Sequence, residues 1–238
     1  MGADLVFEQL FDPESSTYTY LIGDRSLGVC ALVDPVREQI DRDLARADAC
    51  GCKLVHTLET HIHADHVTAG NELTQRRGSR PVLHRDSPVH CDALRVGHGD
   101  RFAIGALPIT VLATPGHTPE SISFYLANPG YVLTGDALLI GTCGRTDFQG
   151  GDPGTLYDSV NAHLFTLPDA TRVYPAHDYN GARFSTIAVE KRENLRLANH
   201  SRAEFVTIMN GLDLPRPKKM DEALPANLNC GKPDPQSA

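Results

Sequence analysis

Short apolar runs alternate with amphipathic segments along the first third of the 238-residue chain. Apolar runs bounded by Gly, Pro or Asp are typical of strands, and apolar positions three or four residues apart are typical of a helix face. Residues 36–47 have the helical spacing, and Gly51 marks the expected end of that helix. The predicted strands are 5–10, 17–22, 30–33 and 53–58, and a second helix is predicted from residue 67 to near Gly78.

The middle of the chain is richer in strands, and the last third is richer in helices. The connections between the middle strands are too short for crossover helices, so we expect antiparallel or mixed pairing. Residues 212–238 are Pro-rich, and we expect an extended strap with a frayed tip. The class is therefore α/β, with helices covering sheets. The predicted strands are 81–84, 100–104, 107–113, 121–126, 131–134 and 173–174, and the predicted helices are 154–164, 183–198 and 202–209.

Composition excludes several functional classes. The chain is 41% hydrophobic and 22% charged, an ordinary globular composition, and it is long enough to bury a substantial core. Its formal net charge is -8, and no Lys/Arg run is interleaved with aromatic residues, which argues against a nucleic-acid partner. No apolar run is long enough to span a bilayer, and the N-terminus lacks a signal-peptide pattern. We expect a cytoplasmic protein, or a mature organellar chain whose leader was removed.

The six cysteines form no C-x-x-C pair and no small-scaffold pattern. In a chain of this length without a secretion signal, such a pattern predicts free thiols. A redox or metal role for Cys50 and Cys52, at a predicted helix end, is the less favoured alternative.

The strongest chemical signal is the stretch 60–66, Thr-His-Ile-His-Ala-Asp-His. Imidazole and carboxylate groups are ligands of zinc and of ferrous iron. The stretch lies between a predicted buried strand and a predicted helix, a turn on which side chains can converge. His61 and His63 are two residues apart, so they point to the same side of an extended segment. A solvated loop or a capping network is the alternative, but this spacing of ligand types favours a metal.

Three more candidate ligands each follow a predicted strand. His117 comes directly after Pro115-Gly116, Asp136 follows Gly135 at a strand end, and His177 follows the short strand at 173–174. Each alone would be read as a cap or a surface residue. Together with His61, His63, Asp65 and His66, they would lie on one rim of the predicted sheets, which makes the set specific for a metal centre.

The order H-x-H-x-D-H, then His, then Asp, then His resembles the metallo-β-lactamase superfamily. The resemblance implies an αββα sandwich, in which two mixed sheets are flanked by helices and the ligands lie at one end. It also implies a single metallo-β-lactamase-like domain over residues 1–238, with a helical and Pro-rich C-terminal segment at 183–238.

Within that superfamily, the chain is similar to the persulfide dioxygenases. The resemblance implies one ferrous ion per chain, held by His61, His117 and Asp136 as a facial triad with three open positions. The remaining four ligand-type residues would orient the ligands and bound water, or complete a two-metal zinc site bridged by Asp136; the ligands alone do not decide this. These four residues are His63, Asp65, His66 and His177. The segments that carry the resemblance are 60–70, 114–121, 143–148, 174–179, 214–217 and 225–227.

The implied reaction oxidises glutathione persulfide with O2 and water to sulfite and glutathione, a step of sulfide catabolism. Glutathione carries two carboxylates, so its pocket should contain cations and hydrogen-bond donors. The candidates are Arg145 and Arg216, with Tyr179 and Asn227 as neutral partners, and a salt bridge or a packing role is the alternative for each. Cys143 is expected to be a buried, inert thiol. Subunit pairing in the family makes a homodimer the expected assembly.

The main rival is a dinuclear zinc hydrolase of the glyoxalase II type, acting on S-lactoylglutathione through a metal-bound hydroxide. Glyoxalase II carries a longer helical domain after the last ligand, whereas only about sixty residues follow His177 here. An RNA-processing nuclease would need an inserted domain and a basic surface. A binding protein with a spent site is disfavoured because every ligand position is retained.

Overall fold

The computed structural model describes residues 3–179 and 181–232. The chain divides into two compact units, each of which is described by itself. The first unit consists of residues 1–96, 102–108 and 216–238, and the second consists of residues 97–101 and 109–215. The single domain expected over the whole chain therefore stays a prediction.

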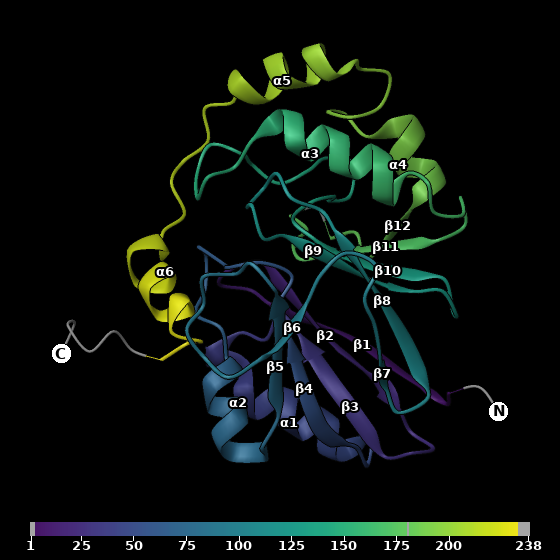
Figure 1. The fold of residues 1–238 in the computed structure, drawn as a ribbon, viewed down its shortest axis with the longest axis vertical. Coiled ribbons are helices and arrows are strands. Elements are labelled where there is room, and N and C mark those ends of the chain that lie inside the picture. Colours follow the sequence, from purple (N-terminus) through teal and green to yellow (C-terminus); the bar gives the residue numbers. More distant parts are fainter. Residues whose placement is uncertain (1–2, 180, 233–238) are drawn as a thin grey trace. The chain divides into compact units, whose positions relative to one another are not determined.

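The first unit is built on a six-stranded mixed sheet whose strands follow chain order (Figure 1). The first three strands pair antiparallel, and the last four pair parallel. Parallel neighbours need crossover connections. Helices form two of the three, α1 (Ile40–Ala49) after a 3-10 turn at Arg37–Gln39, and α2 (Gly70–Arg77), and a loop forms the third. The strands are β1 (Leu5–Asp12), β2 (Thr17–Asp24), β3 (Val29–Val33), β4 (Lys53–Leu58), β5 (Arg80–His84) and β6 (Leu94–Val96).

Helices α1 and α2 bury their apolar faces against this sheet. Ile40 and Leu44 of α1 and Leu73 of α2 join Leu21 and Leu32 of the strands in one buried cluster. The spacing of Ile40 and Leu44 is the helical repeat expected from the sequence. Gly78 ends α2 in the left-handed conformation, with φ of 69°, as its position predicted.

The second unit is built on the other six-stranded sheet, in the order β12-β11-β10-β9-β8-β7. Strands β8, β9 and β10 pair antiparallel, β10 and β11 pair parallel, and β12 pairs antiparallel with β11. The antiparallel or mixed pairing expected for the middle strands is confirmed for β8, β9 and β10. The strands are β7 (Arg101–Ile104), β8 (Leu107–Ala113), β9 (Ile122–Leu126), β10 (Tyr131–Gly135), β11 (Arg172–Pro175) and β12 (Ser185–Thr186), with residues 102–108 belonging to the first unit.

The second sheet is accompanied by α-helices (Figure 1). Helix α3 (Pro153–Ser159) continues into a π-helix (Val160–Leu164), and together they form the crossover between β10 and β11. Leu156 and Val160 of this crossover pack with Val132 and Val173 in the core of the unit. The other helices are α4 (Ile187–Glu193) and α5 (Arg202–Asn210), and a capping box of Ser201 and Glu204 begins α5.

The prediction of one long helix over 183–198 is wrong. Residues 185–186 form β12, and α4 ends before Asn194, whose backbone is extended. The Asn194 side chain accepts from the N–H groups of Arg196 and Leu197 and donates to the carbonyl of Thr142. These bonds hold a turn that competes with the helix.

The Pro-rich segment near the C-terminus is not an extended strap throughout. Residues Met220–Leu228 form helix α6, which contains Pro225. Ala223 and Ala226 of α6 are buried with Val67 of the first unit. Tertiary burial of this face therefore outweighs the helix-breaking tendency of the proline. The expected frayed tip, residues 233–238, lies outside the described residues.

The prediction that all cysteines are free is wrong for two of them. Cys91 and Cys230 form a disulfide across 139 residues of sequence. The other four are free and buried, and burial raises the pKa of Cys30 to about 12 and that of Cys143 to about 11. Cys143 is thus the inert thiol that was expected.

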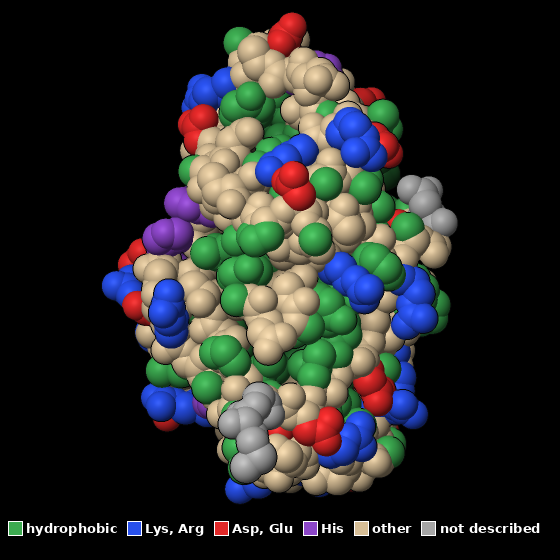
Figure 2. All heavy atoms as spheres, turned by 90° about the vertical axis from the view of Figure 1, so that its right-hand side faces the viewer, with side chains coloured by type: hydrophobic (Ala, Val, Ile, Leu, Met, Phe, Trp, Pro, Cys, Tyr) green, Lys and Arg blue, Asp and Glu red, His purple; other side chains and the backbone are tan. Residues whose placement is uncertain are grey.

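Charged side chains are mixed on the visible surface. On the face in Figure 2, Lys and Arg side chains lie scattered among acidic and neutral ones. None of the described helices combines the length and the hydrophobicity that a membrane span requires.

Candidate metal centre

The metal loop, residues 59–69, connects β4 to α2 in the first unit. The side chains of His61, His63 and His66 are all buried. The ring centroids of His61 and His63 lie 4.0 Å apart, and those of His63 and His66 lie 4.3 Å apart. Although the loop is not a regular strand, the two histidines lie side by side, as their spacing predicted.

Asp34 positions the start of the metal loop. It follows β3, and because β3 and β4 are parallel, Asp34 and Glu59 leave the sheet at the same edge. One carboxylate oxygen of Asp34 accepts from the backbone N–H of Thr60 at 2.7 Å, and the other accepts from the Thr60 hydroxyl at 2.8 Å. Sequence reasoning missed Asp34, whose only local signal is a strand-ending Asp before Pro35.

The same contacts fix the proton on His61. The Thr60 oxygen Oγ1 lies 2.9 Å from Nδ1 of His61. A threonine hydroxyl has one proton, and here Asp34 accepts it, so Oγ1 must accept from Nδ1–H of His61. In the neutral ring, Nε2 is then the nitrogen with a lone pair, the form that binds a metal.

His63 lies among carboxylates. Its Nε2 is 3.1 Å from Asp34 and 3.8 Å from Glu59. Burial opposes protonation of His63, but Asp34, Asp65 and Glu59 outweigh it and raise the pKa of His63 to about 9. Burial raises the pKa of Glu59 to about 8, with His63 opposing the rise. A site that attracts protons this strongly favours positive charge, whether a proton or a metal ion supplies it.

Three ligand-type side chains converge in the second unit. Strands β8, β10 and β11 run in the same direction, so their carboxyl ends meet at one edge of the sheet. His117, Asp136 and His177 each follow one of these ends. Nε2 of His117 lies 3.6 Å from one Asp136 oxygen, and Nε2 of His177 lies 3.7 Å from the other.

Both distances are longer than those of hydrogen bonds. Nδ1 of His117 lies 2.7 Å from the carbonyl of Arg145, which can only accept, so this nitrogen carries the proton. In the neutral ring Nε2 then turns a lone pair toward the Asp136 carboxylate, and a cation between them would relieve the repulsion. Two atoms each about 2.1 Å from one ion lie about 3.0–3.5 Å apart at octahedral or tetrahedral angles, slightly closer than the atoms of these pairs. Oδ1 of Asp136 is buried and has no hydrogen-bond partner among the described residues.

Glycines set the backbone around His117 and Asp136. Gly116 has a φ of 134°, and a Cβ there would lie 2.3 Å from the backbone of Leu156. A Cβ on Gly144 would lie 2.5 Å from the carbonyl oxygen of Asp136. Both turns therefore require glycine, and they bring the chain close enough to hold the two ligands.

The four predicted substrate-binding residues have different surroundings. Arg145 binds Asp147 and the carbonyls of Leu214 and Pro215. Arg216 pairs with Asp221. Tyr179 is 70% exposed and its ring stacks on that of His177.

Asn227 lies in the first unit with its side chain buried. Its amide donates to the carbonyls of His63 at 2.8 Å and His66 at 2.9 Å, and its oxygen accepts from the N–H of Thr68 at 2.9 Å. Its observed contacts are those of a brace for the metal loop. Its glutathione-binding role stays a prediction, as do those of Arg145, Arg216 and Tyr179.

The family model described as the Metallo-beta-lactamase superfamily matches residues 12–177. The chain belongs to this superfamily. The α/β class with two mixed sheets and flanking helices is thereby confirmed. Within the first unit, His63, Asp65 and His66 form a group that could hold a metal ion, as expected for this superfamily.

Individual relatives refine this placement. The chain is 44% identical to "Persulfide dioxygenase ETHE1, mitochondrial" of Mus musculus, over 99% of this chain and 92% of that protein. The crystal structure of ETHE1 from Myxococcus xanthus matches with a TM-score of 0.92 and 52% identity, over 95% of this chain and 99% of that chain. A hydroxyacylglutathione hydrolase of Bradyrhizobium sp. is 39% identical, over 76% of this chain and 69% of that protein. The resemblance to persulfide dioxygenases is confirmed.

Proposed function

We propose that this protein is an iron-dependent persulfide dioxygenase, which oxidises glutathione persulfide with O2 and water to sulfite and glutathione. The observation that carries the proposal is the 44% identity to a persulfide dioxygenase over 99% of the chain. The hydroxyacylglutathione hydrolase matches a smaller share of the chain at lower identity.

The proposed iron ligands are His61, His117 and Asp136, one Fe(2+) per chain. The hydrogen bonds of the two histidines support this assignment, since each Nδ1 is committed to an oxygen and each Nε2 keeps the metal-binding form. Two nitrogens and one carboxylate form the facial set typical of ferrous oxygenases. His63, Asp65, His66 and His177 are proposed to orient these ligands and bound water.

When bound, ferrous iron would supply the redox chemistry that joins O2 to the outer sulfur of the persulfide. The protein's own groups have simpler tasks. Thr60 and the carbonyl of Arg145 keep the protons on Nδ1 of His61 and His117, so neither ring turns. Tyr179, exposed beside His177, is the candidate whose surroundings best suit contact with the glutathione moiety.

The second candidate function is a dinuclear zinc hydrolase of S-lactoylglutathione. One observation favours it: His63, Asp65 and His66 offer ligand atoms that lie within 4.8 Å of one another. A second metal there would generate hydroxide for attack on a thioester carbonyl.

Metal analysis of the purified protein, paired with two assays, separates these candidates. We expect about one iron per chain, oxygen uptake on glutathione persulfide, and sulfite as the product. Two zinc ions per chain, with hydrolysis of S-lactoylglutathione and no oxygen uptake, would overturn the proposal. Light scattering on the same sample tests the expected homodimer.

A further inference from the structure

The C-terminal clamp, residues 220–232, closes over the metal loop within the first unit. Asn227 bonds the carbonyls of His63 and His66, as described above. Three residues later, the carbonyl of Cys230 accepts from the N–H of Asn71 in the first turn of α2 at 2.9 Å. A Cβ on Gly231 would lie 2.1 Å from the carbonyl oxygen of Thr68. The clamp therefore contacts both the metal loop and the helix that follows it.

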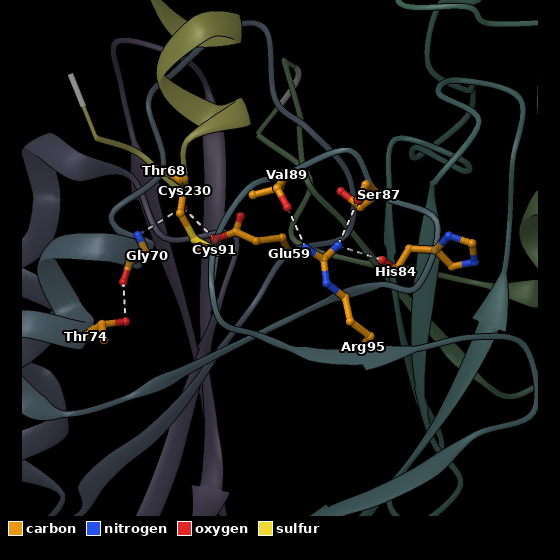
Figure 3. Close-up of a disulfide and its surroundings, with 10 residues drawn as sticks. All are labelled: Glu59, Thr68, Gly70, Thr74, His84, Ser87, Val89, Cys91, Arg95 and Cys230. Atoms are coloured by element: carbon orange, nitrogen blue, oxygen red, sulfur yellow. Dashed lines mark hydrogen bonds between the residues drawn. A yellow bond between two sulfur atoms is a disulfide. The ribbon is translucent and has the colours of Figure 1, made fainter. Parts of the chain in front are cut away.

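The disulfide ties this clamp to a second loop, residues 85–93, between β5 and β6. The guanidinium of Arg95 holds that loop by donating to the carbonyls of His84, Ser87 and Val89 (Figure 3). The N–H of His90 donates to the carbonyl of Leu228 in the clamp. The bond between Cys91 and Cys230 is the covalent link between the Arg95-held loop and the brace on the metal loop.

The two cysteines of the disulfide, Cys91 and Cys230, differ in exposure. Cys230 is 5% exposed, and it lies in a cluster with Ile62 of the metal loop and with Leu83. Cys91 is half-buried and packs on the edge of that cluster. A thiolate from solution therefore meets Cys91 more readily than Cys230.

We propose that the Cys91–Cys230 disulfide is a thiol-reactive modification site that sets how firmly the C-terminal clamp holds the metal loop. A low-molecular-mass thiolate attacks the sulfur of Cys91, forming a mixed disulfide and releasing the thiolate of Cys230, which takes up a proton. A second thiolate attacks the outer sulfur of the mixed disulfide, which releases Cys91 and a symmetrical disulfide. The protein disulfide gains two electrons and two protons, and two thiols lose them.

Opening the bond removes the constraint on the position of Asn227. Hydrogen bonds and apolar contacts of the clamp still hold it in place, but no covalent bond to the second loop does. The carbonyls of His63 and His66 lose their partner whenever the clamp lifts. The effect on metal retention rests on the proposed metal site, whereas the effect on the loop backbone does not. Where the proposed reaction releases glutathione, its own product is a thiol of the required class.

The test compares the oxidised chain with the same chain treated with reduced glutathione. Alkylation and intact mass identify the bonded cysteines, and hydrogen exchange of residues 60–72 reports loop opening in the metal-free protein. Metal loss to an added chelator is measured on the iron-loaded protein. We expect about tenfold faster exchange and metal loss after reduction, because a released brace opens more often.

Matched variants sharpen this test. Cys91→Ala should show the fast hydrogen exchange of the reduced chain, and glutathione should not change it. Cys50→Ala removes a free cysteine of the same unit, so its exchange should respond to glutathione as that of the wild type does. Asn227→Ala should speed hydrogen exchange of the metal loop in both redox states, although its two cysteines can still form the disulfide. Cysteines that stay free after mild oxidation, or equal exchange in both states, would overturn the inference. Redox-dependent exchange in a chain that binds no iron would instead overturn the proposed metal site alone.

Discussion

The two units hold their candidate ligands in different ways. In the first unit, His61, His63, Asp65 and His66 lie within six residues of one irregular loop. In the second unit, His117, Asp136 and His177 come from three separate strand ends. The register of neighbouring strands positions the second set, whereas side chains from distant segments must brace the first. The ligands that are close in sequence therefore depend more on bracing by distant side chains than the ligands that follow separate strands.

The largest expected effect is in the second unit, at the carboxylate that both histidines face. Asp136→Ala removes the oxygens 3.6 Å from His117 and 3.7 Å from His177. Iron affinity should fall by more than about 100-fold, and oxygen uptake should be lost with it. Titration with Fe(2+) under anaerobic conditions measures the affinity. Asp158→Asn, on the exposed face of α3, is the control, and full iron-dependent activity in Asp136→Ala would contradict the ligand assignment.

The backbone dependence of the second unit is tested at Gly116. A Cβ there meets the backbone of Leu156, and the φ of 134° is strained for any other residue, so Gly116→Ala should lower the free energy of unfolding by about 3 kcal/mol or more. Gly141→Ala is the matched control, because its φ is also positive but its Cβ would meet nothing. That variant should cost only about 1 kcal/mol. Urea unfolding compares the two, and equal losses would show that the close approach at Gly116 is unimportant.

The side-chain brace of the first unit is tested at Asn227. Asn227→Ala leaves two buried carbonyls and one N–H without their partner, so stability should fall by about 2–4 kcal/mol. Among the described residues, the side-chain amide of Asn229 donates to the carbonyl of Pro225 alone, so Asn229→Ala should lower stability by much less. If chemical denaturation gives the same midpoint for both variants, the metal loop does not depend on the clamp.

The raised pKa values of His63 and Glu59 predict that the stability of the metal-free protein depends on pH. The folded-state pKa values of His63, about 9, and Glu59, about 8, lie above the ordinary 6.5 and 4.5. The stability gained from protonation is full below the ordinary values and is lost as pH rises through the folded ones. The metal-free protein should therefore lose about 4 kcal/mol between pH 7 and 10. Thermal unfolding of His63→Gln should show a flatter profile, and an unchanged one would contradict the assignment to His63.

The smallest effect is expected from Thr60→Val, which keeps the shape of the side chain but removes the acceptor for Nδ1 of His61. Iron affinity should fall by about tenfold, because the ring loses its fixed tautomer and orientation. Thr207→Val, which removes an exposed hydroxyl bonded to the carbonyl of Ala203, serves as the control. Equal iron affinities in the two variants would contradict the inference that Asp34 orients His61 through Thr60.

Much of the fold follows from local patterns. Strand β4 covers the predicted residues 53–58, and β8 covers 107–113, since apolar runs with clear breakers at both ends leave little choice. The three-residue strand β6 was not predicted, because only one of its side chains is fully buried and its periodicity is too short to detect. The helix expected through Asn194 failed because a side chain bonded across to Thr142, a contact that no local window contains.

The sequence by itself determined the ligand types, their order along the chain and the superfamily, because metal chemistry restricts these positions to His and Asp at fixed distances from strand ends. Only the tertiary structure decided that Asp34 orients the metal loop, that Asn227 braces it, and that Cys91 pairs with Cys230. Asn227 meets the loop across more than 150 residues of sequence, and the disulfide spans 139. Contacts at that separation depend on how packed elements meet, which local periodicity does not encode.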